Sequence, residues 1–139
     1  MESADRNKER IKELTADFWN TANMAAFDKY YADDFVVHMA DGDKSRDEYK
    51  ALCQAYFAAF PDLQITADGY LAEGDRVTKI WTAHATHRGE FMGIPASGNA
   101  MEVRGIEVFR LAHGQVVELW VSMDVLGMMQ QMGAIPQTA

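Results

Sequence analysis

The sequence is poor in cysteine, in proline and in basic residues. Its 139 residues include one cysteine, Cys53, which cannot form an internal disulfide. Lys and Arg number 13 against 21 Asp and Glu, and the formal net charge of −8 opposes nonspecific binding to nucleic acid or to an anionic membrane surface. No apolar run approaches the roughly 20 residues that a membrane-spanning helix requires. The sequence therefore predicts no nucleic-acid partner and no membrane partner.

What the sequence does contain is enough apolar material for a folded core. Hydrophobic residues make up 48% of the chain, and a domain of this length buries roughly 68% of the surface that its unfolded chain exposes. Without a repeat or a linker in the sequence, we expect a single domain over residues 1–139. Residues 1–6 lack the apolar segment of a signal peptide, which together with the single cysteine predicts a cytoplasmic location.

The first part of the chain has the periodicity of helices. Apolar side chains recur at helical spacing within residues 5–20, which predicts an amphipathic helix. A shorter helix is expected over residues 24–30, with Asn23 as its N-cap. Residues 35–39 form a brief apolar run typical of a strand, and residues 40–44 are expected to form a turn.

The pattern changes after the next helix. Ser45 and Glu48 form a capping-box pattern, and the apolar spacing behind them predicts a helix that ends at Pro61. Beyond it, runs rich in β-branched and aromatic residues predict four strands, over residues 64–70, 76–87, 100–111 and 115–123. Short turns favour antiparallel pairing of these strands, and a last helix is expected over residues 125–132. Helices first and a meandering sheet second are typical of an α+β fold.

Side-chain alternation along the strands suggests a hollow on one face of the sheet. One face of the predicted strand over residues 76–87 has small side chains between an aromatic ring and an imidazole, which leaves space. Its residues are Trp81, Ala83, Ala85 and His87. Two further faces could converge on this space, one with Gly105, Glu107 and Phe109 and the other with Glu118, Trp120, Ser122 and Asp124. A mostly apolar hollow with a few inward polar groups is the usual composition of a small-molecule site. Alternatively, Trp81 and Trp120 are ordinary core aromatics.

Asp124 has two interpretations. It ends a predicted strand and precedes the last helix, so its carboxylate could cap that helix by accepting backbone N–H groups. It could instead lie beside Trp120 in a poorly solvated hollow, where desolvation would raise its pKa and make it a proton acceptor and donor near neutral pH. The two interpretations predict opposite shifts of the pKa.

Glu107 and two histidines are the other candidates for chemistry. Glu107 lies in the middle of an apolar strand, where it either lines a pocket or takes part in a structural pair, although Arg104 and Arg110 point to the opposite face. His87 shares a face with Trp81, and His38 ends a strand before a polar turn; each is either a pocket residue or a solvated strand end. Residues 41–43 lack the spacing of a calcium loop, and no phosphate-binding or nucleophile-elbow motif is present. We therefore expect neither a metal nor a cofactor.

The segments of the second half resemble a known family. They read AEGDRV at residues 72–77, WT at 81–82, THRGEFMGIP at 86–95, GIEVFR at 105–110, GQVVELW at 114–120, and QQMG at 130–133 behind Asp124. Together with FPDL at residues 60–63, they resemble the SnoaL-like polyketide cyclases, also called ester cyclases, of the nuclear transport factor 2-like superfamily. The resemblance implies a cone-shaped α+β barrel in which a curved, mainly antiparallel sheet and N-terminal helices enclose a pocket, commonly in a homodimer or homotetramer.

The resemblance also implies a reaction and a set of site residues. Asp124 matches the aspartate that serves as acid and base in an intramolecular aldol ring closure without metal or cofactor. We expect His87 and Glu107 to assist it, and the substrate, a hydrophobic carbonyl compound, to contact His38, Trp81, Trp120, Phe109 and Ser122. Two other functions stay open: a related isomerase or epoxide hydrolase that uses the same pocket, and a noncatalytic domain that binds a small molecule.

Overall fold

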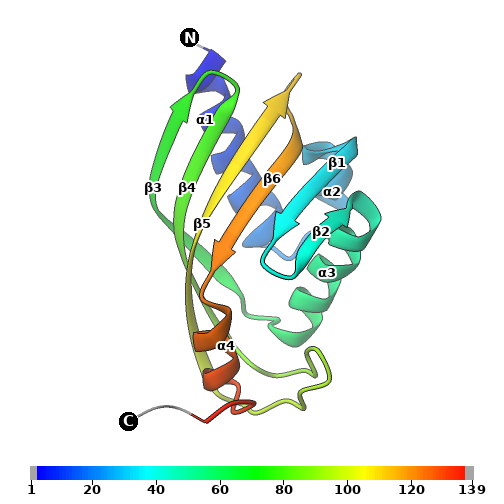
Figure 1. Ribbon diagram of the computed structural model, residues 1–139, viewed down its shortest axis with the longest axis vertical. Coiled ribbons are helices and arrows are strands. Elements are labelled where there is room, and N and C mark those ends of the chain that lie inside the picture. Colours follow the sequence, from blue (N-terminus) through cyan, green and yellow to red (C-terminus); the bar gives the residue numbers. More distant parts are fainter. Residues whose placement is uncertain (1–2, 137–139) are drawn as a thin grey trace.

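A computed structural model describes residues 3–136 and contains a six-stranded sheet whose concave face is covered by helices (Figure 1). The strand order is β2-β1-β6-β5-β4-β3. The strands are β1 (Tyr31–Met39), β2 (Gly42–Ser45), β3 (Gln64–Glu73), β4 (Arg76–Thr86), β5 (Ala100–Ala112) and β6 (Gln115–Met123). The helices are α1 (Ser3–Leu14), η1 (Thr15–Trp19), η2 (Met24–Ala26), α2 (Phe27–Tyr30), α3 (Arg46–Ala59) and α4 (Val125–Gln131). This is the α+β fold that the sequence predicts.

The helices agree with the sequence pattern except at their ends. Ser45 accepts a hydrogen bond from the Glu48 N–H, and the Glu48 side chain accepts one from the Ser45 N–H, so the capping box of α3 is confirmed. The first helix begins before Asp5 and continues past Leu14 as a turn of π-helix, η1. Asn23 makes no side-chain cap, and the segment behind it starts as a 3₁₀ turn before α2.

The sheet has one strand and one pairing that the sequence analysis missed. Residues 42–44, expected to be part of a turn, form β2 together with the capping residue Ser45, and this strand pairs antiparallel with β1. Strand β1 begins at Tyr31 rather than at residue 35, and it runs parallel to β6. The sheet is therefore mixed, although its other pairs are antiparallel.

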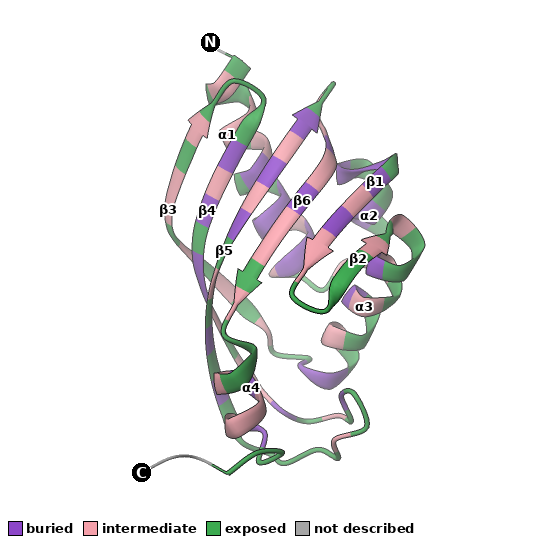
Figure 2. Ribbon diagram, viewed as in Figure 1, coloured by how far each residue is buried: buried purple, intermediate pink, exposed green. Residues whose placement is uncertain are grey.

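The register between β5 and β6 decides which side chains face the helices. Directly opposite residues of neighbouring strands point to the same face, and β5 pairs Glu107 with Val121 and Gly105 with Met123. The alternate residues of β6, including Trp120 and Ser122, therefore point to the outer face of the sheet. Figure 2 shows this alternation as bands of buried and exposed residues along the strands.

Two groups of buried apolar side chains fill the space between the sheet and the helices. One lies under α1, η1 and α2 and includes Leu14, Phe18 and Phe109. The other lies toward α4 and includes Phe60, Trp81, Phe91, Met101 and Met128. Among the described residues, no helix is long and apolar enough to cross a membrane.

Candidate active site

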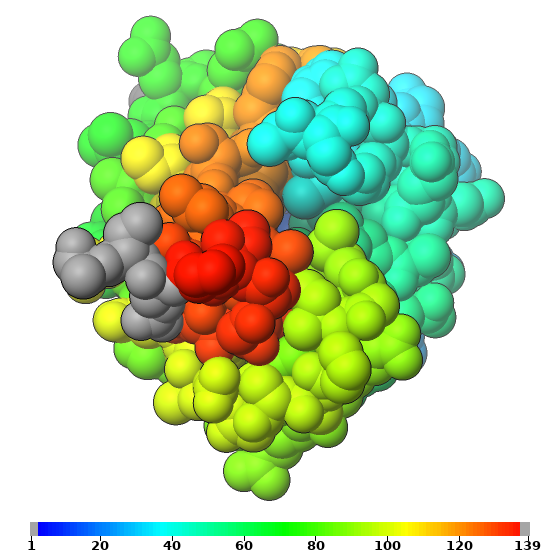
Figure 3. Space-filling model, turned by 60° about the horizontal axis from the view of Figure 1, so that its bottom comes forward, coloured from blue at the N-terminus to red at the C-terminus, as the bar shows by residue number. Residues whose placement is uncertain are grey.

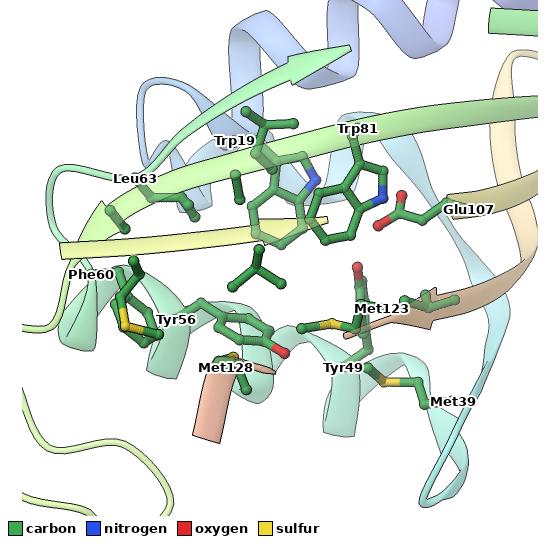
Figure 4. A pocket seen from close by; sticks show the side chains of 16 residues that line it. Trp19, Met39, Tyr49, Tyr56, Phe60, Leu63, Trp81, Glu107, Met123 and Met128 are labelled. Atoms are coloured by element: carbon green, nitrogen blue, oxygen red, sulfur yellow. The ribbon is translucent and has the colours of Figure 1, made fainter. Parts of the chain in front are cut away.

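A pocket opens between these two groups of core residues (Figure 4). The sheet contributes Met39, Ile65, Trp81, Ala83, Ala85, Met101, Val103, Glu107, Val121 and Met123, and the helices and loops contribute Trp19, Tyr49, Tyr56, Phe60, Leu63 and Met128. The expectation that Trp81, Ala83 and Ala85 face a hollow is confirmed. Alanine at two successive inward positions of β4 leaves the space that larger side chains would fill.

The pocket is narrow and bordered by flexible side chains. Its volume is about 80 Å³, less than an engineered cavity of about 150 Å³ that binds benzene. The molecular surface is hollowed where the β1–β2 hairpin, α4 and the segment between β4 and β5 meet (Figure 3). Four methionines line the pocket, Met39, Met101, Met123 and Met128. Because methionine is unbranched and adaptable, a ring-sized ligand can enter if these side chains turn outward.

Glu107 is the ionisable carboxyl group among the side chains that line the pocket. It lies on β5, and its side chain is 8% exposed. Burial raises the pKa of Glu107 above the usual 4.5, and the positive charge of Lys79 opposes this shift. A carboxylate with a raised pKa is a stronger base than one in water, and its protonated form persists closer to neutral pH. Glu107 can therefore both accept and donate a proton inside the pocket.

Lys79 is the cation nearest to Glu107 along the sheet, and it is 1% exposed. The two residues are direct cross-strand partners on β4 and β5, so both side chains point toward the helices. Desolvation lowers the pKa of Lys79, and the charge of Glu107 opposes this shift. Burial thus disfavours the charged form of each group, and the charge of each group favours the charged form of its partner.

Trp81 places a polar atom next to Glu107. Its indole Nε1 is buried and has no hydrogen-bond partner among the described residues. In Figure 4, the nitrogen edge of the Trp81 ring faces the Glu107 carboxyl group. An unpartnered buried N–H group costs free energy unless a ligand or water accepts its hydrogen bond, so this edge of the pocket is suited to an oxygen acceptor.

His87, expected to assist catalysis, is buried but does not line the pocket. Its Nδ1 lies 2.9 Å from Ser97 Oγ and accepts a hydrogen bond from the Ser97 N–H at 3.2 Å. Its backbone also bonds to Asn99 and Gly98, and its ring packs against Phe60. These contacts hold the loop between β4 and β5. They leave His87 outside the pocket lining, and its expected role in catalysis stays a prediction.

Asp124 lies outside the pocket, on the exposed end of β6. Its Oδ1 accepts a hydrogen bond from the Gly127 N–H at 2.8 Å and caps α4. A Cβ atom at position 127 would overlap Asp124 Oδ2 and lie 2.7 Å from its carboxyl carbon, so another residue there would require the Asp124 side chain to shift. Of the two interpretations of Asp124, the structure supports the helix cap, and the placement beside Trp120 in a poorly solvated hollow is wrong.

Three other expected contacts lie on the outer face of the sheet. Trp120 stacks on His38, with ring centroids 5.4 Å apart, and the Arg76 guanidinium group also lies over the Trp120 ring. His38 is hydrogen-bonded to Glu118 at 2.6 Å and to Asp43 at 2.8 Å, and these two carboxylates raise the pKa of His38. Ser122 is exposed. The expected inward face of β6 is wrong by one residue, because Leu119, Val121 and Met123 point inward.

Phe109 does share a face with Glu107, but it is not among the residues that line the pocket. It is 0% exposed and belongs to the core under α1, with Leu14 and Phe18. The expected substrate contact is therefore a core contact. Conversely, the sequence analysis missed Lys79 as well as the pocket residues Trp19, Tyr49 and Tyr56, although all four lie at inward positions of their elements. Among residues 3–136, no group of three or more His, Cys, Asp or Glu is placed to hold a metal ion.

Comparison with known proteins identifies the family. The family model of SnoaL-like polyketide cyclases matches residues 9–132. The chain belongs to the SnoaL-like polyketide cyclase family. A search of curated proteins found no match.

Three solved structures share the fold over most of this chain. AclR from Streptomyces galilaeus, a suspected hydroxylase, is 31% identical, with a TM-score of 0.91 over 99% of this chain and 87% of AclR. A suspected polyketide cyclase from Acidithiobacillus ferrooxidans is 29% identical, with a TM-score of 0.82 over 96% of this chain and 98% of that one. IdmH from Streptomyces antibioticus, also a suspected polyketide cyclase, is 27% identical, with a TM-score of 0.78 over 91% of this chain and 98% of IdmH. Proteins with different suspected reactions are thus similar to this chain.

Proposed function

We propose that the protein is a polyketide cyclase-like enzyme that binds a hydrophobic carbonyl compound and closes a ring by an intramolecular aldol reaction. The observation that carries this proposal is the position of Glu107, a carboxyl group with a raised pKa in an otherwise apolar pocket. Membership of the SnoaL-like family supports the same class of reaction. In this proposal Glu107 takes the role that the resemblance assigned to Asp124.

The reaction needs one group that moves a proton twice. The Glu107 carboxylate removes a proton from the carbon next to a carbonyl group, which leaves an enolate. The enolate carbon then attacks a second carbonyl carbon of the same molecule, so a C–C bond forms and the second C=O group becomes an alkoxide. Protonated Glu107 returns the proton to this alkoxide. The apolar walls hold both ends of the substrate together, which converts the attack into a reaction within one bound molecule.

The first step can be tested before the natural substrate is known. In D₂O, we expect the protein to accelerate exchange of the protons next to the carbonyl group of an aromatic ketone such as 2-tetralone, measured by ¹H NMR. The control is the same ketone with Asp124→Asn protein, whose pocket is unchanged. Exchange at the buffer rate with saturating wild-type protein contradicts the proposed proton transfer.

The second step separates ring closure from the other functions. A diketone that can cyclise should give a ring product of unchanged mass, which chromatography and mass spectrometry resolve from the starting compound. A shifted double bond would indicate an isomerase, and addition of water to an epoxide would indicate a hydrolase. A ligand recovered unchanged would favour the noncatalytic binding domain. The homodimer or homotetramer and the cytoplasmic location stay predictions.

A further inference from the structure

The pocket contains a hydrogen-bond donor beside its proton-transfer group. The Trp81 indole nitrogen is buried without a partner among the described residues, and in Figure 4 it lies on the edge of the ring that faces the Glu107 carboxyl group. Both side chains line the same pocket, on neighbouring strands β4 and β5. Tyr49, Tyr56 and Trp19 also line the pocket. Of the donors in this lining, the Trp81 indole nitrogen is the one that is buried without a hydrogen-bond partner among the described residues.

The orientation of the indole ring depends on a glycine. Gly105 is the direct cross-strand partner of Trp81, and the Trp81 ring occupies the space where a side chain at position 105 would begin. A Cβ atom at position 105 would overlap the six-membered part of the ring and lie 2.7 Å from the carbon that is bonded to Nε1. Any other residue at position 105 would push the ring away from the strand. Gly105 therefore positions the nitrogen edge of Trp81.

Removal of a proton next to a carbonyl group requires two aligned protein groups. A base takes the proton from carbon, and a donor stabilises the negative charge that develops on the carbonyl oxygen. A donor that is already oriented in a poorly solvated site gives this stabilisation without reorganisation during the reaction. The substrate carbonyl then lies with its oxygen at Trp81 and its neighbouring carbon at Glu107.

We propose that the Trp81 Nε1–H group donates a hydrogen bond to the substrate's carbonyl oxygen, and that Gly105 is the positioning residue that aims it. This inference deepens the proposed function, because it rests on a carbonyl ligand in the same pocket. It assigns a polar role to Trp81 beside the apolar contact expected from the sequence, and it places the reacting carbonyl end of the substrate at Glu107.

Two probes of the same shape test the donor directly. Acetophenone carries a carbonyl group where α-methylstyrene carries a C=CH₂ group. We expect acetophenone to move the Trp81 indole ¹H resonance downfield in a ¹H–¹⁵N spectrum, with the resonance assigned through Trp81→Phe. We expect α-methylstyrene to bind without this downfield shift. The shift is read in the wild-type protein, and the variant serves only to assign the resonance.

The variant adds an energetic test. Trp81→Phe should weaken acetophenone binding about tenfold, the effect of one lost hydrogen bond, and should change α-methylstyrene binding much less. Equal losses for both probes, an unmoved indole resonance at saturation, or no saturable binding of acetophenone would overturn the inference. Glu107→Gln distinguishes this inference from the proposed function. The indole shift with acetophenone should persist in this variant, because it reports the Trp81 donor and not proton transfer by Glu107.

Discussion

Glu107→Gln lowers the rate of ketone deuterium exchange by about 10²–10⁴-fold, the usual contribution of a positioned acid or base. Glutamine keeps the shape of the side chain and removes the group that accepts the proton. The residue lines an apolar pocket, and water there has little room to replace it. The rate is measured by ¹H NMR at saturating ketone, after circular dichroism and thermal unfolding show that the variant is folded.

Asp124→Asn is the matched control for this result. Asn is also a good N-cap residue, and Asp124 caps α4 at an exposed position. We therefore expect the Asn variant to keep its fold and an exchange rate close to that of the wild type. If Asp124→Asn abolishes exchange while Glu107→Gln retains it, the roles of the two carboxyl groups are the reverse of those proposed here.

Gly105→Ala destabilises the protein by about 1–3 kcal/mol, the usual cost of forcing a methyl group into a packed site. The new methyl group would overlap the Trp81 ring, which is bounded by the pocket wall. The ring must leave the strand, so this variant should also lose the Trp81 indole shift that acetophenone causes. Urea unfolding measures the free energy of unfolding, and the ¹H–¹⁵N spectrum reports the ring.

Gly69→Ala provides the comparison. Gly69 lies in β3, and a Cβ atom there would meet nothing within 4 Å. Alanine also restricts the unfolded chain more than glycine does, so we expect this variant to be as stable as the wild type or slightly more stable. Equal losses of stability in the two variants would show that the cost comes from losing glycine in a strand and not from contact with Trp81.

The sequence predicts those parts of the fold whose signals are local. The capping box at Ser45 and Glu48 lies within one turn of helix, and the last antiparallel strands are joined by short turns that fix their neighbours. The parallel pairing of β1 with β6 joins segments about 80 residues apart, as His38 and Trp120 illustrate. No local pattern in either segment specifies that contact.

The candidate site depended on a register that could be misread by one residue. Each face of β6 carries large apolar side chains. Because Trp120 is aromatic, the sequence analysis assigned its face, with Glu118 and Ser122, to the pocket. The opposite set, Leu119, Val121 and Met123, is apolar throughout, and this signal could have decided the face. A shift of one residue moves every side chain of a strand to the other face, which placed Asp124 wrongly as well.

Lys79 shows a different limit of sequence analysis. Its position between Val77 and Trp81 places it on the inward face of β4, but lysine is almost never fully buried unless it is paired. Its partner, Glu107, is directly opposite only in the register of the folded sheet. The pair could be recognised only after the strand pairing was known.

The most direct test of the account is the pKa of Glu107 in the wild-type protein. It is measured by ¹³C NMR titration of the side-chain carboxyl group, with the resonance assigned through Glu107→Gln. We predict a pKa above 4.5, because burial raises it more than Lys79 lowers it. A raised pKa also means that protonated Glu107 contributes to the free energy of unfolding. This contribution should be fully present below pH 4.5 and should be lost as the pH rises through the higher pKa. A pKa at or below 4.5 would place Glu107 in a solvated or fully ion-paired site and would contradict its proposed role.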